Sequence, residues 1–426
     1  MFENFPKYTN YDPKVPVWCL TPNEGRCIHR FFDTSPISPS GEFAAVLRLP
    51  FEDRLNQAGD AAQVVLINLK TGEEKVVAET CGWEPQMGAN INWGGDDHAL
   101  IFNDVDTQTW TPQIVKLDPQ TGKKERIEGG VYHVSPDGRY AAASSTDRMC
   151  RTQVGYGVFL PEDRIPRNIG ARDDDGLFIT DLETGERKLV FTLAQALEVI
   201  PAMDDENPDD WEIYGFHCKW SPQGDRLIFT IRRFPKEGEN RFNLINCGHK
   251  SGQQLRFDVL TLKPDGSDVH NAVPSKYWDH GGHHINWYPD GKSLSMNLGG
   301  FGDGLSLVRV GYDGSDIRPI VENFPGSGHP SVHPDGKHMV ADTYAWDQRC
   351  GFGDGTIPIR WIDTTTATEE CLVRIGAVTE PKPHPALRVD PHPAWHRNWE
   401  WLSFNGVLPN ENTRRVFLAD LKGVIG

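Results

Sequence analysis

The sequence predicts an all-β chain folded as a seven-bladed β-propeller, and three observations support this. A turn of the Ser-Pro-Asp-Gly type recurs along the chain, a short apolar strand follows each copy, and a second strand motif recurs between the turns. Repeated units of this kind are the sequence signature of a propeller. The 42 glycines, 31 prolines and 13 tryptophans suit many short strands joined by tight turns.

The first motif is a tight turn that occurs once in each of seven units. Proline sets the backbone for such a turn, and glycine supplies the positive φ that the turn needs. The strand after each turn is continuously apolar or alternating. The seven turns are SPSG (38–41), GGDD (94–97), SPDG (135–138), SPQG (221–224), YPDG (288–291), HPDG (333–336) and the degenerate HRNW (396–399).

The second motif is a β-branched strand that ends in a polar turn, as in QVVLINLKTGEE and GLFITDLETGER, and it also occurs seven times. Each unit therefore has three recognisable strands and a weaker fourth. The last unit stops at LADLKGVIG and lacks its fourth strand. We expect the N-terminal segment 14–20 to supply that strand, which would close the ring and remove an exposed edge. Residues 1–426 are then one domain.

The turns are unevenly spaced, which places insertions at 150–175, 195–212, 234–253 and 345–356. The second of these is expected to hold a short helix and an acidic loop. Long loops on a rigid scaffold often carry function.

A histidine register is the main sign of a functional site. The residues four positions before the seven turns are Thr34, Asn90, Val131, His217, His284, His329 and His392. Equivalent positions of the innermost strands face a propeller axis at similar depth, so the four histidines are expected to converge. Imidazoles bind zinc, manganese, iron or nickel, and one can act as a general base. His133 lies two residues after the same position in the third unit.

A purely structural interpretation stays open. A histidine in a propeller strand usually fixes a turn, and duplication can copy one packing residue into several units. Against this, the four histidines occupy adjacent units, while the other three units carry Thr, Asn and Val. The tryptophan near each turn is expected to pack the blade.

Two further groups of polar side chains lie near the channel units. The segment 146–157 carries Arg148, Arg151 and Tyr156, which can offer an anion clamp and a phenol. In the fourth unit, Tyr214 precedes His217 and Arg232 follows the next strand. The alternative for both groups is a solvated loop whose arginines pair with nearby carboxylates.

Composition excludes several classes of protein. The formal net charge of −17 argues against a nucleic-acid binder or an anionic-membrane binder. No apolar run is long enough to span a bilayer, and the N-terminus lacks the pattern of a secretory signal. The eight cysteines are scattered without a CxxC pair, which indicates reduced thiols and a cytoplasmic protein. We expect a monomer or a homodimer.

Several segments resemble a known family. GFHCKWSPQG, GGHHINWYPDG, DPHPAW and RRVFLADL are similar to segments of the oligogalacturonate lyases and their ulvan-lyase relatives, most strongly from 214 to 421. The resemblance implies a cytoplasmic seven-bladed propeller that cleaves uronate oligomers by metal-assisted β-elimination. It implies manganese first, with zinc or calcium as alternatives.

The resemblance also implies roles for residues at matching positions. His217 corresponds to the base, and His284 and His392 correspond to metal ligands, with either His283 or His284 as the ligand of the fifth unit. The family draws a glutamine and a second histidine from its last blade, where this chain has Arg388 and Asp390. His329, together with Asp390, is the natural substitute. This departure leaves the identity of the sugar acid open.

The chemistry of elimination fits these residues. The reaction removes the proton α to a carboxylate, which must be neutralised by a metal or an arginine, and expels the O4 leaving group. We assign Arg151 or Arg232 as the carboxylate partner and Tyr156 or Tyr214 as the group that protonates the leaving oxygen. Arg148, Tyr214, His133 and Arg388 are expected to bind an acidic oligosaccharide. A glycoside hydrolase, a lactonase and a non-catalytic TolB-like binding propeller are the alternatives.

Overall fold

The sheets are built from consecutive antiparallel strands. The computed structural model describes residues 2–200, 207–236, 256–377 and 384–425. Five sheets have four strands each, in sequence order. They are β2 (Cys27–Ile28), β3 (Phe43–Arg48), β4 (Ala62–Asn68) and β5 (Glu74–Thr80); β6 (Asn92–Trp93), β7 (Leu100–Asp106), β8 (Thr111–Leu117) and β9 (Lys124–Glu128); β10 (His133–Val134), β11 (Tyr140–Ala143), β12 (Gly176–Asp181) and β13 (Arg187–Thr192); β14 (Trp211–Trp220), β15 (Leu227–Pro235), β16 (Arg256–Leu262) and β17 (His270–Val273); and β18 (Gly282–Trp287), β19 (Ser293–Gly299), β20 (Leu305–Gly311) and β21 (Arg318–Pro319).

The remaining sheet has eight strands and joins the two ends of the chain. Its strands are β22 (Ser331–Val332), β23 (His338–Ala341), β24 (Thr356–Asp363), β25 (Thr368–Gly376), β26 (Ala394–Trp395), β27 (Trp401–Val407), β28 (Arg414–Asp420) and β1 (Val17–Cys19). A single residue pair, Gly376 with Val407, connects β25 to β27. Strand β1 pairs with β28 through Val17 and Ala419, which confirms that the N-terminal segment supplies the outer strand of the last unit.

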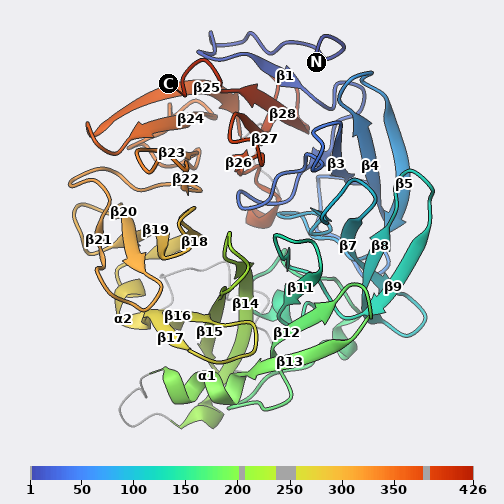
Figure 1. Ribbon diagram of the computed structural model, residues 1–426, viewed down its shortest axis with the longest axis vertical. Coiled ribbons are helices and arrows are strands. Elements are labelled where there is room, and N and C mark those ends of the chain that lie inside the picture. The colour runs from blue at the N-terminus through green and yellow to red at the C-terminus, as the bar shows by residue number, and fades with distance from the viewer. Residues whose placement is uncertain (1, 201–206, 237–255, 378–383, 426) are drawn as a thin grey trace.

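The repeat read from the sequence corresponds to the observed strands. The strands expected after the seven turns are β3, β7, β11, β15, β19, β23 and β27, and the second motif forms the strand that follows each of them. Figure 1 shows the sheets arranged around a common centre, with β14, β18, β22 and β26 toward that centre and the two termini at one side. The all-β prediction is confirmed. The number of blades stays a prediction, because two expected units share the eight-stranded sheet.

Helices are few and short in the described residues. They are α1 (Leu193–Val199), α2 (Ser275–Trp278) and 3-10 turns at Met149–Arg151, Glu162–Arg164, Pro208–Asp210 and Pro385–Leu387. Helix α1 begins at a capping box, in which the side chains of Thr192 and Gln195 bond each other's backbone amides. It is the short helix expected in the 195–212 insertion. Residues 201–206 of that insertion, and most of the expected 234–253 insertion, lie outside the described residues. No helix in the described part is long and apolar enough to cross a membrane.

The antiparallel order separates two faces of the molecule. The Ser-Pro-Asp-Gly turns join the first strand of each unit to the second at one edge, which we call the turn face. The connections from second to third strand must then lie at the opposite edge, which we call the loop face. The loop face therefore carries the long segments 144–175 and 342–355, together with residues 384–393 that lead into β26.

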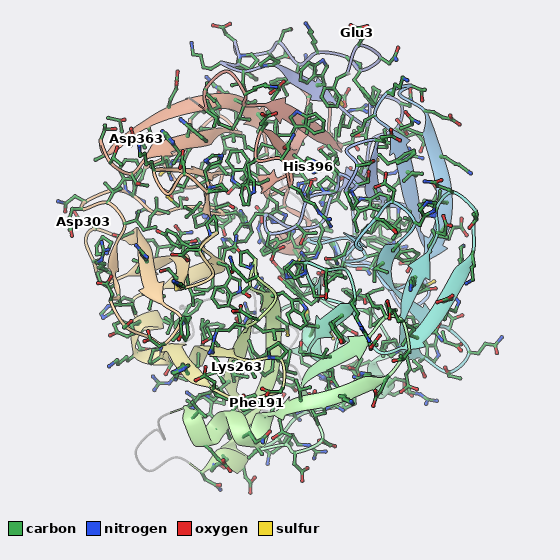
Figure 2. The ribbon with its side chains drawn as sticks, in the orientation of Figure 1. Glu3, Phe191, Lys263, Asp303, Asp363 and His396 are labelled. Atoms are coloured by element: carbon green, nitrogen blue, oxygen red, sulfur yellow. The ribbon has the colours of Figure 1, made fainter. Side chains whose placement is uncertain are left out.

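Side chains fill the space between the sheets. Apolar residues of neighbouring sheets form clusters, such as the one that joins the third and fourth sheets through Leu177, Ile213 and Phe229. Figure 2 shows the labelled Glu3, Asp303 and Asp363 at the periphery, whereas His396 lies near the centre. Burying this apolar area between sheets is the main contribution to stability.

A segment of the first unit crosses the centre of the ring. After β2, residues 29–34 run inward, and the side chains of Phe31 and Phe32 are each 1% exposed. The Arg30 guanidinium donates to Asn90 Oδ1 at 3.2 Å and to the Tyr132 carbonyl, so it contacts the second and third sheets. No pattern in the sequence predicted this central segment.

A buried lysine holds the central segment to the fourth and fifth sheets. Lys219 Nζ lies 2.8 Å from Asp33 Oδ2 and donates to the Ile285 carbonyl at 2.8 Å, and its side chain is fully buried. Burial opposes ionisation of Asp33, but Arg30 and Lys219 outweigh it and hold the pKa of Asp33 far below its usual range. Removing one member of a buried charge cluster leaves the remaining charges less well compensated.

Lys219→Met is expected to lower the free energy of unfolding by about 3–5 kcal/mol, because Asp33 keeps its buried charge without the lysine. Denaturant unfolding followed by circular dichroism measures the change. Asp33→Asn, which leaves both Arg30 and Lys219 without their shared carboxylate, should destabilise the protein at least as much, and Lys263→Met, on an exposed lysine, is the control. Unchanged unfolding of Lys219→Met would contradict the structural role of this pair.

Candidate functional site

The four register-matched histidines surround one aromatic ring. The ring centroid of Phe31 lies 5.6 Å from His217, 5.9 Å from His284, 5.4 Å from His329 and 4.7 Å from His392. Residues more than a hundred positions apart thus meet at the centre, as the register predicted. No signal in the sequence indicated that a phenylalanine would lie among them.

Local irregularities in the backbone set the direction of two of these histidine side chains. The β14–β15 pairing shifts its register across His217, and the β18–β19 pairing shifts across His284. Such bulges re-aim a side chain and are common beside functional sites. His284 and His392 also have positive φ values of 60° and 52°. A non-glycine residue held in this region is strained and marks a candidate functional position.

Three residues meet in an arrangement that can hold a metal ion. The ligand atoms of His329, Asp390 and His392 all lie within 4.8 Å of one another, and the three side chains are buried. His329 Nε2 and both ring nitrogens of His392 are buried and have no hydrogen-bond partner among the described residues. Buried polar atoms are normally satisfied. Nitrogen and carboxylate oxygen donors fit a divalent cation of the first transition row.

Asp342 positions the two histidines of this cluster. Its carboxylate lies 2.9 Å from His329 Nδ1, and it accepts hydrogen bonds from the backbone amides of His329 at 2.6 Å and His392 at 3.1 Å. Because a carboxylate only accepts, His329 carries its proton on Nδ1 and directs the Nε2 lone pair into the cluster. A carboxylate behind a histidine in this way is typical of metal ligands.

His284 is stacked on His329 and has a defined tautomer. The two ring centroids are 3.7 Å apart with planes inclined by 28°. His284 Nδ1 lies 2.6 Å from the Gly328 carbonyl, which can only accept, so the proton is on Nδ1. Its Nε2, 3.5 Å from the Tyr344 hydroxyl, is left as the nitrogen with a lone pair. His283 Nδ1 lies 2.9 Å from His284 Nδ1. Because His284 is the one stacked on His329, we favour His284 over His283 as the inner residue.

A cationic side chain adjoins the metal-type cluster. Arg388 Nε lies 2.8 Å from Asp390 Oδ2. Burial acts to lower the pKa of Arg388, but Asp390 and the nearby hydroxyls of Tyr156 and Tyr344 raise it, so the guanidinium stays charged. The site thus contains a positive group beside a potential metal, inside a chain whose net charge is −17.

Arg232 and Tyr156 were expected in the site, and they lie close to one another. Arg232 lies over the Phe216 ring at 3.5 Å and donates to Gln153 Oε1 at 2.8 Å. Burial lowers its pKa to about 9, and the nearby Tyr156 acts in the opposite direction. Burial raises the pKa of Tyr156, whose ring centroid is 5.3 Å from that of Phe216.

His217 lies in a largely aromatic environment. Its ring is stacked on Phe216 at 4.0 Å and lies 5.1 Å from Tyr132, between ring centroids. Burial, followed by the charges of Lys219 and Arg232, lowers its pKa well below the usual value. His217 is therefore neutral near neutral pH. Its Nε2 has no hydrogen-bond partner among the described residues.

The other expected binding residues take part in local networks. Arg148 Nη1 lies 3.1 Å from Asp175, and Arg151 Nη2 donates to the Ile165 carbonyl at 2.8 Å. The Tyr214 hydroxyl donates to Glu212 at 2.6 Å. His133 Nδ1 accepts from the Trp220 amide at 3.0 Å, and its side chain lines a cavity of about 330 Å³ on the turn face. Each of these four residues makes a local contact, and their roles in binding stay predictions.

Two functional candidates escaped sequence reasoning because they lie outside the histidine register. Asp342 follows directly after the apolar strand β23, and a carboxylate at that place was the available signal. Tyr344 lies two residues later and contacts both His284 and His329, with ring centroids 6.2 Å apart in each case. It lines a cavity of about 640 Å³ on the loop face, together with His283.

Comparison with solved structures shows that known proteins share this fold, whereas the sequence comparisons find no match. A scan against protein-family models finds no match, and a search of curated protein sequences finds none either. Among solved structures, an oligogalacturonate lyase from Vibrio parahaemolyticus is similar with a TM-score of 0.61 and 15% identity, over 98% of this chain and 96% of that chain. An oligogalacturonate lyase in complex with manganese has a TM-score of 0.61 and 14% identity over the same shares.

The chain has the fold of these two lyases. At 15% and 14% identity the likeness concerns the fold, and it confirms, at that level, the resemblance read from the sequence motifs. The coverage of 98% includes nearly the whole chain and not one repeated unit. Activity and ligands need separate arguments, because one fold hosts many functions.

Buried neutral histidines make the folded protein sensitive to acid. Burial lowers the pKa of His133 to about 3 and that of His29 to about 4, against about 6.5 for an unfolded histidine. The unfolded chain binds more protons between these values, so stability falls as the pH is lowered from about 7 to about 5 and returns as it rises.

His133→Gln, which keeps an acceptor for the Trp220 amide, should remove about 1–2 kcal/mol of that pH-dependent loss. The free energy of unfolding measured across the pH range tests this. His98→Gln, on an exposed histidine, is the control. An equal slope in the wild type and His133→Gln would contradict the neutral state of the half-buried His133.

Proposed function

We propose that this protein is a lyase that cleaves uronic-acid-containing oligosaccharides by metal-assisted β-elimination at the centre of the ring. The observation that carries the proposal is the convergence of His329, Asp390 and His392 beside the charged Arg388. A metal and an arginine at one point are suited to a carboxylate substrate, which both of them can neutralise. The architecture we propose is one seven-bladed domain, in which the eight-stranded sheet comprises two blades.

The residues present fit a divalent cation. His329, Asp390 and His392 would hold it, and His284 can add its Nε2 from the ring stacked on His329. Manganese is our first choice because one solved structure of this fold is described as a manganese complex, with zinc and calcium as alternatives. When bound, the cation would withdraw charge from the uronate carboxylate and make the neighbouring C–H proton more acidic.

His217 is the proposed base. It is neutral near neutral pH, and its Nε2 has no hydrogen-bond partner among the described residues, so its lone pair can accept a proton. In the proposed reaction, this nitrogen takes the proton α to the carboxylate. The electron pair forms the new C=C bond as the C–O bond to the leaving sugar breaks.

Arginines and a phenol complete the proposed assignment. Arg388 stays charged and Arg232 lies over Phe216 beside Tyr156, so we favour these two over Arg151 as partners of the substrate carboxylate. Burial keeps the Tyr156 hydroxyl protonated, as a donor to the leaving oxygen must be. The partner is an acidic oligosaccharide that approaches from the loop face, and the free thiols of the described cysteines suit a cytoplasmic location.

Metal binding is the first expectation. The purified wild type should carry close to one equivalent of divalent metal, measured by mass spectrometry, and His329→Ala/His392→Ala should carry none. Asp342→Asn should weaken metal affinity by about ten- to a hundredfold, because His329 loses its orienting carboxylate. The matched control is Asp335→Asn, which alters a histidine–aspartate pair outside the site. An equal metal content in all variants would exclude this cluster as the metal site.

Elimination by His217 is the second expectation. The wild type, incubated with uronate oligomers, should generate the ultraviolet absorbance of an unsaturated uronate. His217→Ala should lower turnover by about a hundredfold or more while it retains the metal, and His98→Ala should behave as the wild type. Reducing ends released without the unsaturated product would indicate a hydrolase. No reaction and no bound metal would favour a binding propeller.

A further inference from the structure

The loop face displays one large aromatic side chain that packing does not explain. Trp346 is 63% exposed, the highest value among the exposed large hydrophobic residues in the described part of the chain. Its ring is stacked on Tyr344, with centroids 4.5 Å apart and planes inclined by 10°. One face of the indole is thus covered by the Tyr344 ring, and the rest is open to solvent. Exposed apolar surface of this kind commonly marks a binding site.

The segment that follows Trp346 is held in place by hydrogen bonds. Asp347 accepts from the Ser327 hydroxyl at 2.7 Å and from Arg349 at 2.8 Å, and Arg349 also donates to the Gly326 carbonyl at 3.1 Å. Asp347 and Arg349 are therefore held in place, and the Trp346 side chain remains exposed. A platform held in this way loses little conformational entropy when a ligand binds.

Tyr344, the inner member of the aromatic pair, contacts two of the histidines. Tyr344 and Trp346 line the 640 Å³ cavity together with His283, Gln348 and Arg349. The Tyr344 hydroxyl lies 3.5 Å from His284 Nε2, and the Tyr344 ring lies 6.2 Å from His329 between centroids. An oligosaccharide lying along the cavity would place one of its units on Trp346 and extend from there toward His284.

We propose that Trp346, supported by Tyr344, is a sugar-binding subsite at the mouth of the site, which stacks one pyranose ring of an acidic oligosaccharide. This inference rests on the proposed function and names the subsite that positions its substrate.

The chemistry of the platform favours a pyranose over other ligands. One face of a pyranose carries C–H groups with a partial positive charge, and the face of an indole carries the negative part of its quadrupole. The hydroxyls at the edge of the sugar can meet the Gln348 amide on the rim of the cavity. Because Asp347 is paired with Arg349, it does not place an uncompensated negative charge beside a uronate.

Calorimetric titration with oligomers of galacturonate and of glucuronate tests the inference on the metal-loaded protein. Trp346→Ala should raise the Kd by about tenfold, and Trp346→Phe, which keeps an aromatic face, by about twofold or less. Phe352→Ala is the matched control, because Phe352 is 45% exposed in the same loop but packs against Arg374. Metal content and thermal midpoint should stay at the wild-type values in all three variants.

The outcomes separate the subsite from the proposed reaction. Wild-type binding that Trp346→Ala weakens supports the subsite, even if no unsaturated product forms and the lyase proposal fails. Wild-type cleavage with an unchanged Kd in Trp346→Ala overturns the subsite alone. Equal weakening by Trp346→Ala and Phe352→Ala overturns it as well, since the effect would then belong to the loop. Absence of wild-type binding to every oligomer overturns both proposals.

Discussion

The buried carboxylate of Asp33 is the interaction on which the centre of this molecule depends. It is shared between Arg30 and Lys219, so a segment of the first unit is attached to the fourth sheet across the ring. The attachment seats Phe31 at the centre, where its ring is within 6 Å of four histidines. The buried charge cluster therefore holds the segment that the candidate site packs against. Its desolvation is tolerable because opposite charges meet within the cluster.

A second carboxylate orients the site itself. Asp342 binds the backbone of both His329 and His392, and it also sets the tautomer of His329. Two units of the eight-stranded sheet are thus tied together at the point where their histidines meet. The positive φ of His392 is maintained by these contacts, so local strain is held by the surrounding hydrogen bonds. Pre-oriented ligands of this kind need little rearrangement to accept a cation.

The electrostatics of the site oppose those of the chain as a whole. The protein is strongly acidic, yet Lys219 is buried and Arg388 and Arg232 are half-buried near the centre. Arginine keeps its charge when buried more readily than lysine does. The interior can therefore attract a carboxylate even though the surface carries excess negative charge. The stacked pair on the loop face adds an uncharged surface next to this cationic centre, and together they match an anionic sugar chain better than either does alone.

The sequence by itself determined the all-β class, the order of the strands, the closing strand at 14–20 and the convergence of four histidines. Each of these follows from a structural unit that recurs along the chain. It also singled out Asp390 and Arg388, which flank one of those histidines. It did not reveal Phe31, Lys219, Asp342 or Tyr344, since each acts on residues far away in the chain and follows no repeat. Nor did it separate Arg232 and Tyr156, which lie near the centre, from Arg148 and Tyr214, which join local networks. Only the tertiary structure decided these points, because which charges are buried together depends on how the sheets pack around the axis.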